Sequence, residues 1–306
     1  MNRIVECVPN FSEGRRPEVV DAIATAIASR PGAYLLDRGM DPDHNRSVIT
    51  FAGTPEAIGD AAFRGVEAAA RLIDLTKHQG VHPRVGAADV VPFVPIRGVT
   101  LDECVAIARD VGRRIATELK IPVFLYEAAA TRPDRVNLEN IRRGQFEGLS
   151  EEIATNPERR PDFGEASIHR TAGATVVGAR KPLIAYNINL NTADVNIARQ
   201  IAKKVRFSSG GLPFVKGMGV LLKTRNIAQV SMNLTDYEQT PIHKVFEAVK
   251  TETERLGVTI AGSEIIGLIP QKALDQTDGR DLKIENFSPA MVIENRLAEV
   301  ISDDGL

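Results

Sequence analysis

The sequence predicts an α/β (α+β) protein made of two ferredoxin-like units, each with the order strand-helix-strand-strand-helix-strand. Three observations support this prediction. The chain has 306 residues, a length that is comfortable for two domains. Its apolar residues follow helical spacing in some segments and form short β-branched runs in others. The order of these segments in the N-terminal part recurs after residue 180. We therefore expect two domains, residues 1–180 and 181–306, with a cleft between them.

The N-terminal part supplies the first set of elements. We expect strands at residues 3–9, 33–37, 45–53 and 90–96, and helices at residues 16–29 and 54–78. Thr54 and Pro55 open the second helix as an N-cap and a first-turn proline. Lys77 and His78 give this helix a basic end, where cations are favourable. Prolines interrupt the strand at 90–96, which favours a place at the edge of the sheet.

The rest of the chain supplies a connecting region and the second set. The capping box of Thr100 and Glu103 opens a helix, and polar residues 130–165 predict loops and short helices that cross between domains. A strand is also expected at residues 121–127, before this connecting region. The second set has expected strands at residues 181–190, 214–223, 227–234 and 258–269, expected helices at 192–206 and 240–256, and a last helix at 289–301. Thr192 is the expected cap of the first of these helices, and Thr224 lies in the turn between two of the strands.

Composition limits the classes of partner that we expect for this protein. The formal net charge is -2, with 43% hydrophobic and 25% charged residues, as in ordinary soluble proteins. Because there is no excess of Lys and Arg, we expect neither nucleic acid nor a membrane surface as a partner. No apolar run approaches the roughly 20 residues that span a bilayer, and the N-terminus has no leader pattern. We therefore expect a cytoplasmic protein.

Two cysteines, Cys7 and Cys104, are present. They allow one disulfide, but two buried free thiols in a reducing cytosol fit this chain better. They do not form a ligand pair at the spacing of a zinc finger.

His82 stands in the segment "LTKHQGVHPRVGAADVVPF", residues 75–93, together with His78. Their i, i+4 spacing suggests a metal site, but Gly80 and Pro83 break the helix and no Glu follows His78. We therefore expect no metal, and assign His78 to the end of the preceding helix as a cation.

His82 itself has two interpretations. A histidine in a loop is usually a surface residue. However, Arg84 and Asp89 lie close by in the sequence, and Gly80 and Gly86 allow the close approach of a ligand. Since histidine exchanges protons near neutral pH, His82 is the best candidate for a general acid or base.

Three other segments are candidates for binding. The segment "TAGATVVGARKPL" lacks the pattern of a phosphate loop, and the glycine-rich residues 208–219 are best explained as a mobile loop before a strand. Residues 161–174 are too irregular for a core element and join the two repeats. For this segment a binding role and a linker role are equally well supported.

Beyond these patterns, the chain resembles the formiminotransferase family, the glutamate formimidoyltransferases of histidine breakdown, over essentially all of residues 1–300. The resemblance lies in "VECVPNFSEG" from Val5, "LLD" from Leu35, "NRSVITFAG" from Asn45, "RLIDLTKHQGVHPRVGAADVVPFVPI" from Arg71, "GATVVGARKPLIAYNINL" from Gly173 and "NIAQVSMNLTDYE" from Asn226. It implies paired ferredoxin-like subdomains with a folate in a tunnel between them. It also implies transfer of the formimidoyl group of N-formimidoyl-L-glutamate to N5 of tetrahydrofolate, the co-substrate.

The resemblance also implies roles for particular residues. The catalytic histidine of the family lies in an H-P-R motif, which here contains His82. The folate-binding segment falls on Gly164, Glu165, Ala166, Ser167, Ile168, His169, Arg170, Thr171, Ala172 and Gly173. Many relatives have Pro where this chain has Arg170, so this loop can follow another path or meet a polyglutamate tail with an extra charge.

The chemistry fits these residues. N5 must lose a proton as it attacks, and the departing glutamate nitrogen must gain one, so one histidine can serve both steps. The substrate carboxylates need cations, for which Arg46, Arg84 and Arg180 are candidates. Each arginine is equally well explained by an ion pair with a structural Asp or Glu.

Two other functions remain open at this point. One is a formyltransferase that uses 5-formyltetrahydrofolate on the same scaffold, because formyl and formimidoyl differ only by O for NH. The other is a folate-binding protein without catalysis. The resemblance, with an apolar strand expected at an exposed edge, also predicts a homodimer.

Overall fold

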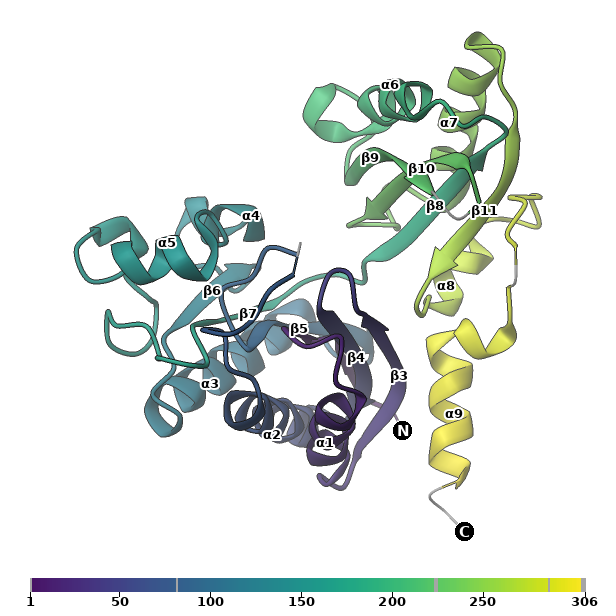
Figure 1. Cartoon of the computed structure of the whole chain (residues 1–306). Helices are drawn as coiled ribbons and strands as arrows, with labels where there is room; N and C mark the ends of the chain where they lie inside the picture. The colour runs from purple at the N-terminus through teal and green to yellow at the C-terminus, as the bar shows by residue number, and fades with distance from the viewer. Residues whose placement is uncertain (1, 81, 223–224, 286, 304–306) are drawn as a thin grey trace. The chain divides into compact units, whose positions relative to one another are not determined.

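The computed structural model describes residues 2–80, 82–222, 225–285 and 287–303. The chain divides into two compact units, Met1–Arg180 (unit 1) and Lys181–Leu306 (unit 2), and each is described by itself. Figure 1 shows both units, with labels on most of their helices and strands.

Unit 1 is built around a mixed sheet. Its strands are β1 (Ile4–Cys7), β2 (Asn10–Phe11), β3 (Ala33–Asp41), β4 (Arg46–Gly53), β5 (Ala88–Arg97), β6 (Val123–Glu127) and β7 (Thr175–Ala179). Its helices are α1 (Pro17–Ala28), α2 (Pro55–Leu72), α3 (Leu101–Glu118), α4 (Leu138–Ile141) and α5 (Gln145–Glu152), with 3-10 turns η1 (Pro133–Arg135) and η2 (Pro157–Arg159).

The first part of unit 1 has the ferredoxin-like arrangement. Strands β1 and β2 form one interrupted strand, which pairs antiparallel with β4 on one side and β5 on the other, while β3 pairs with β4. The spatial order is therefore fourth, first, third and second strand of a split βαββαβ motif. Strands β7 and β6 extend this sheet beyond β5 through parallel pairings.

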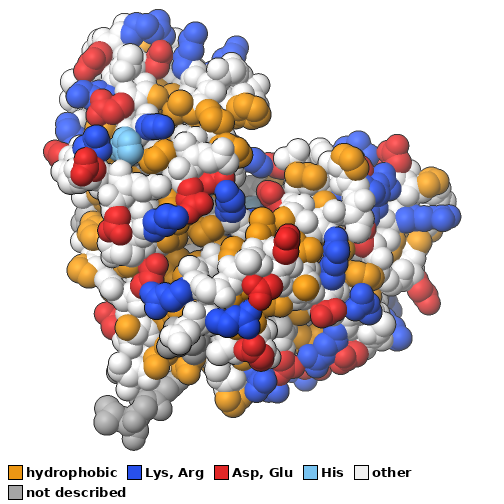
Figure 2. Space-filling model, turned by 180° about the vertical axis from the view of Figure 1, so that it is seen from behind, with side chains coloured by type: hydrophobic (Ala, Val, Ile, Leu, Met, Phe, Trp, Pro, Cys, Tyr) orange, Lys and Arg blue, Asp and Glu red, His pale blue; other side chains and the backbone are white. Residues whose placement is uncertain are grey.

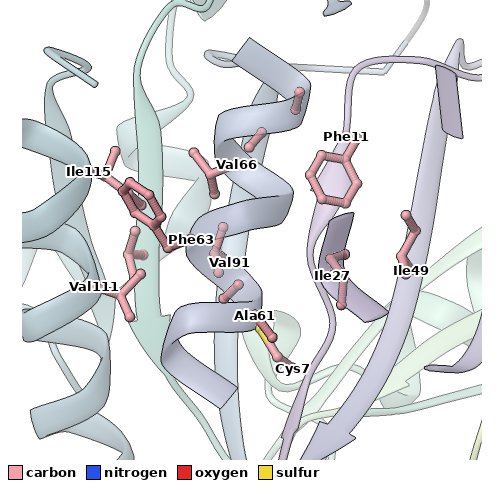
Figure 3. Close-up of a cluster of buried hydrophobic side chains, with 14 of the residues drawn as sticks. Cys7, Phe11, Ile27, Ile49, Ala61, Phe63, Val66, Val91, Val111 and Ile115 are labelled. Carbon is pink, nitrogen blue, oxygen red and sulfur yellow. The ribbon is translucent and has the colours of Figure 1, made fainter. Parts of the chain in front are cut away.

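Helices cover both faces of the sheet in unit 1 (Figure 1). Helices α1, α2 and α3 pack on one face and form the main core, in which Phe63 of α2 lies beside Val111 and Ile115 of α3 (Figure 3). On the other face, α4 and α5 cover a smaller apolar cluster that includes Phe124 and Val176. Because side chains alternate along a strand, Arg46 of β4 points away from the main core.

Unit 2 is a second ferredoxin-like sheet. Its strands are β8 (Ile184–Leu190), β9 (Val215–Leu222), β10 (Ile227–Leu234) and β11 (Ile260–Ile266), in the antiparallel order β11-β8-β10-β9. Its helices are α6 (Val195–Val205), α7 (Ile242–Arg255), α8 (Gln271–Asp275) and α9 (Ile293–Asp303), with 3-10 turns η3 (Phe207–Ser209) and η4 (Pro289–Met291). Side chains of α6 and α7 share a buried core with one face of this sheet. The predicted fold of two βαββαβ units is confirmed.

Several expectations for individual elements are corrected. The proline-containing strand β5 is an inner strand between β1/β2 and β7, not an edge. Pro92 has no N–H to donate within the sheet, but its carbonyl accepts from the N–H of Val8. Strand β7 was not predicted, and residues 130–165 belong wholly to unit 1 instead of crossing between domains.

The helix boundaries also differ in part. Thr100 and Glu103 form the predicted capping box of α3. Helix α6 is capped by Asp194, whose carboxylate accepts from the N–H of Asn196, and not by Thr192. Thr224, the expected turn residue, lies outside the described residues.

Both cysteines are free and buried, as predicted. Throughout the described ranges, every helix is too short or too polar to cross a membrane.

Candidate active site

Residues 73–87 join α2 to β5, and we call them the His82 loop. The helix before this loop ends at Leu72, six residues earlier than the sequence suggests. Both ends of the loop are held by backbone hydrogen bonds to the segment that precedes β7: Leu75 N–H donates to Thr171 O at 2.8 Å, and Ala87 N–H donates to Ala172 O at 2.9 Å. The loop and the predicted folate segment therefore lie against each other within unit 1.

Two glycines permit this contact. A Cβ atom on Gly86 would lie 1.8 Å from the carbonyl oxygen of Ala174, and one on Gly173 would lie 2.2 Å from that of Val85. Gly173 also has a φ of +73°, which L side chains rarely adopt. Any larger residue at these positions would push the His82 loop away from the segment.

His82 lies beside Arg46, the first residue of β4. The Nη1 atom of Arg46 is 2.9 Å from Nε2 of His82. A guanidinium has donors and no acceptor, so Nε2 must accept this hydrogen bond with its lone pair. His82 is therefore neutral and carries its proton on Nδ1.

Further charged groups surround this pair. Arg142, at the end of α4, makes an ion pair with Asp89 of β5, which is only 2% exposed. His44, in the turn between β3 and β4, bonds through Nδ1 to Asp41 at 2.6 Å. The ring of His44 meets that of His82 edge-on, with their centroids 6.4 Å apart.

This surrounding lowers the pKa of His82 to about 3. Burial is the largest cause, because it disfavours the charged imidazolium. The positive charges of Arg46 and Arg142 act in the same direction, and Asp41 opposes them. In this state His82 stays neutral across the physiological range.

His78 and Arg84 form a second cluster behind the loop. Arg84 is 7% exposed and makes two hydrogen bonds to the carboxylate of Glu147, at 2.6 and 2.8 Å. Its Nε donates to Nδ1 of His78 at 3.2 Å, and Nε2 of His78 donates to the carbonyl of Asn45 at 2.9 Å. His78 is therefore neutral and lies beyond the helix, so its assignment as a helix-end cation is wrong.

Asn45 connects this cluster to the neighbouring loops. Its backbone has a φ of +50°, which Asn tolerates better than most residues. Its side chain accepts from Gly14 N–H at 2.9 Å and donates to Gln79 O at 2.9 Å. A cavity of about 500 Å³ lies here, lined among others by Asn45, His78 and Lys77.

The predicted folate segment, residues 164–173, is exposed mainly in its N-terminal part, and its last two residues are buried. Gly164, Glu165, Ser167 and Arg170 are exposed. Two members are structural: Ile168 packs against the apolar cluster under α4 and α5, and Nδ1 of His169 accepts from Ala172 N–H at 3.0 Å. Burial lowers the pKa of His169, which is therefore neutral as well.

Of the three candidate arginines, only Arg46 contacts His82. Arg180 is half-buried at the end of β7, and its N–H donates to Phe93 O at 3.1 Å. Arg142 comes from a polar connecting region, where local sequence patterns do not mark it as a site residue. Asp41 and His44 were overlooked although they flank the motif that begins at Asn45. Among the described residues, no group of three or more His, Cys, Asp or Glu side chains is placed to hold a metal ion.

The fold and this site define a protein of two ferredoxin-like units with a neutral histidine beside a guanidinium in unit 1. Residues 4–180 match the family model described as "Formiminotransferase domain, N-terminal subdomain", and residues 185–302 match "Formiminotransferase domain". The chain belongs to the formiminotransferase family.

Individual relatives agree with this membership. The chain is 49% identical over 298 residues to a glutamate formimidoyltransferase of Streptococcus pyogenes serotype M1, covering 97% of this chain and 99% of that protein. It is 47% identical to a glutamate formimidoyltransferase of Thermoplasma acidophilum, covering 96% and 97% respectively. It is also 47% identical to the formimidoyltransferase-cyclodeaminase of Mus musculus, over 90% of this chain and 51% of that protein.

Proposed function

We propose that this protein is a glutamate formimidoyltransferase, which moves the formimidoyl group of N-formimidoyl-L-glutamate to N5 of tetrahydrofolate. The observation that supports this most strongly is the near-full-length similarity to two proteins of that name, at 49% and 47% identity. Both family models also fall on the two units of the chain.

The reaction needs one proton to move between two nitrogens. N5 of tetrahydrofolate attacks the amidine carbon and forms the new C–N bond, and His82 takes the proton that N5 gives up. The imidazolium of His82 then gives this proton to the α-nitrogen of glutamate, whose bond to the amidine carbon breaks. General acid–base catalysis of this kind typically contributes about 10²–10⁴-fold in rate.

Arg46 is the best candidate for the substrate carboxylate. Arg84 is already paired with Glu147 through two hydrogen bonds and is buried, so using it would break an existing ion pair. Arg46 is next to His82 and makes no such pair with a carboxylate of the described chain. Arg180 remains a candidate for a second carboxylate.

The folate segment supports binding of the co-substrate in the same unit. It is fixed at its C-terminal end to the His82 loop, while its N-terminal part is exposed. We propose that residues 164–173 form one wall of the tetrahydrofolate site, with Arg170 available to a polyglutamate tail. Hydrogen exchange with and without folate checks this: protection elsewhere, but not at 164–173, would contradict it.

The activity is tested by turnover with two donors measured side by side, N-formimidoyl-L-glutamate and 5-formyltetrahydrofolate with glutamate as acceptor. We expect transfer of the formimidoyl group to tetrahydrofolate and little formyl transfer. Faster formyl transfer would favour the formyltransferase, and folate binding without turnover would favour a binding protein. The same assay after treatment with a chelator addresses the expected independence from metal ions.

We also propose that the protein is a homodimer. In the described part of unit 2, β9 pairs with β10 on one side only. Its side chains Met218 and Leu221 are 60% and 39% exposed, and such an edge favours pairing with another chain. Strand β5, the edge first suggested by the sequence, gives no support because it is an inner strand. Light scattering should give twice the mass of one chain, and a stable monomer at micromolar concentration would exclude the dimer.

The other partners follow from charge and thiol chemistry. Basic and acidic side chains are interspersed over the face shown in Figure 2, without a large area of one sign. Together with the net charge of -2, this supports small-molecule substrates and not nucleic acid or an anionic membrane. The two free thiols support a cytoplasmic location.

A further inference from the structure

The contact between Arg46 and His82 conflicts with the role proposed for His82. A base must offer a lone pair, and the lone pair of Nε2 is already used by the Nη1–H group of Arg46 at 2.9 Å. The other ring nitrogen, Nδ1, carries the proton and cannot accept one. With this contact in place, His82 therefore has no free ring nitrogen with which to take a proton from N5.

The electrostatic environment adds to this block. Positive groups face His82 from β4 (Arg46) and from the end of α4 (Arg142), and His44 faces it from the turn after β3. The two nearby carboxylates are already engaged, Asp41 with His44 and Asp89 with Arg142. With its pKa at about 3, His82 would be a weak base at neutral pH.

Arg46 is itself incompletely paired. Burial and the charge of Arg142 lower the pKa of Arg46, while the negative charges of Asp41 and Asp89 oppose this shift. Among the described residues, the neutral ring of His82 is the acceptor for its guanidinium, and no carboxylate forms an ion pair with it. A carboxylate brings a negative charge and can accept two parallel hydrogen bonds from a guanidinium, whereas the neutral ring of His82 offers one lone pair. An incoming carboxylate would therefore compete successfully with His82 for Arg46.

We propose that Arg46 is a positioning residue that couples substrate binding to release of the base: a carboxylate of the glutamyl substrate takes the guanidinium of Arg46, and Nε2 of His82 becomes free to accept a proton. This inference rests on the proposed function and adds a regulated step to it. The carboxylate also places a negative charge near the ring, which favours the imidazolium and raises the pKa of His82. His82 thus becomes a stronger base only when the glutamyl group is bound.

The coupling has a use in the reaction. The substrate that brings the carboxylate also brings the amidine carbon, so the base is released only when the group to be transferred is present. Before that, His82 is held neutral and correctly oriented by Arg46. A substrate analogue without the carboxylate would bind and leave the base blocked, which predicts a fall in kcat as well as a rise in KM.

The coupling is tested without turnover by NMR titration of protein labelled at the Cε1 atom of histidine. Comparison with His82→Gln assigns the His82 signal. In the unliganded protein we expect His82 to remain neutral well into the acid range. Saturation with L-glutamate should raise its pKa by about one unit or more. Bound L-glutamate that leaves the titration of His82 unchanged would overturn the proposal, and so would failure of L-glutamate to bind.

Two variants sharpen the test. In Arg46→Met, which removes the charge and the donors, the pKa of His82 should be raised before any ligand is added, and L-glutamate should no longer shift it. Arg38→Met is the matched control, because Arg38 is an exposed arginine of β3 paired with Asp21. In this variant His82 should titrate as it does in the wild-type protein, with and without L-glutamate. If Arg46→Met does not fold, the titration of His82 in the wild-type protein, with and without L-glutamate, still tests the coupling.

Kinetics separate this inference from the proposed function. The pH profile of kcat/KM reports the free enzyme, and that of kcat reports the complex. We expect the acid limb of kcat at a higher pH than that of kcat/KM in wild type, and no such difference in Arg46→Met. Absence of formimidoyl transfer would reject the function, while transfer with identical acid limbs would reject the coupling alone.

Discussion

His82 is the residue on which the candidate mechanism depends, and its removal should affect rate more than folding. In His82→Ala we expect kcat to fall by about 10²–10⁴-fold, or roughly 3–5 kcal/mol of barrier. Folate affinity should change little, because the lost interaction belongs to the transition state. Steady-state kinetics with both substrates saturating measures this.

The matched control is His243→Ala on α7 of unit 2, which should keep wild-type kcat. His78→Ala is not suitable as a control, because His78 connects Asn45 to Arg84 inside the site. A His82→Ala variant that retains more than about a tenth of wild-type kcat would contradict the acid–base role.

The same histidine should make stability depend on pH. Its pKa is about 3 in the folded protein and about 6.5 in the unfolded chain, so the unfolded state binds more protons between these values. The contribution of neutral His82 is complete above pH 6.5 and is lost as the pH falls toward 3. The free energy of unfolding should therefore decline less steeply with acid in His82→Asn than in wild type. Urea denaturation at several pH values measures both slopes, and equal slopes would show that the pKa of His82 is not lowered.

At the scale of elements, the contribution of the capping box of α3 to stability can be tested directly. Thr100 accepts from Glu103 N–H, and the carboxylate of Glu103 accepts from Thr100 N–H at 2.7 Å. Thr100→Ala should lower the free energy of unfolding by about 1 kcal/mol. Thr117→Ala, on an exposed turn of the same helix, should have little effect. Chemical denaturation that finds equal stability in both variants would argue against the cap.

The junction between the His82 loop and residues 171–174 gives a second test. A methyl group at Gly86 would collide with the carbonyl of Ala174, so Gly86→Ala should reduce both stability and activity. Gly148→Ala on α5 is the control, because a Cβ atom there meets nothing within 4 Å and alanine favours a helix. Thermal unfolding together with turnover compares them. A Gly86→Ala variant with wild-type activity would mean that the loop position does not matter for catalysis.

Element prediction succeeded where local rules act and failed where tertiary contacts decide. The capping box of α3 and the two βαββαβ units follow from short-range patterns. The inner position of β5 does not, because it depends on β7, a strand that comes about 80 residues later. The site shows the same division: His82 stood out by its loop, whereas Arg142 reaches it from a distant helix end that local sequence does not mark.

At the scale of the molecule, the chain has two units with separate apolar cores. Unit 2 is a four-stranded ferredoxin-like sheet, while unit 1 carries the same arrangement with β6 and β7 added. The added strand β7 contributes to the site, because the segment that leads into β7 holds the His82 loop by backbone hydrogen bonds. In the described part of unit 2, the sheet consists of the four strands of the motif without added strands.

The positions of the two thiols make it possible to measure the unfolding of unit 1 separately. Cys7 and Cys104 are the only cysteines, and both lie in the core of unit 1. Burial raises the pKa of both thiols, that of Cys104 to about 12. Only a thiolate that meets the reagent is alkylated, so each labelling event requires unit 1 to open. Pulsed alkylation in rising urea should therefore time the opening of unit 1 alone, while loss of helical circular dichroism reports both units. Labelling of the native protein as fast as that of a free thiol would contradict this, and a lag between the two signals would show one half of the chain unfolding before the other.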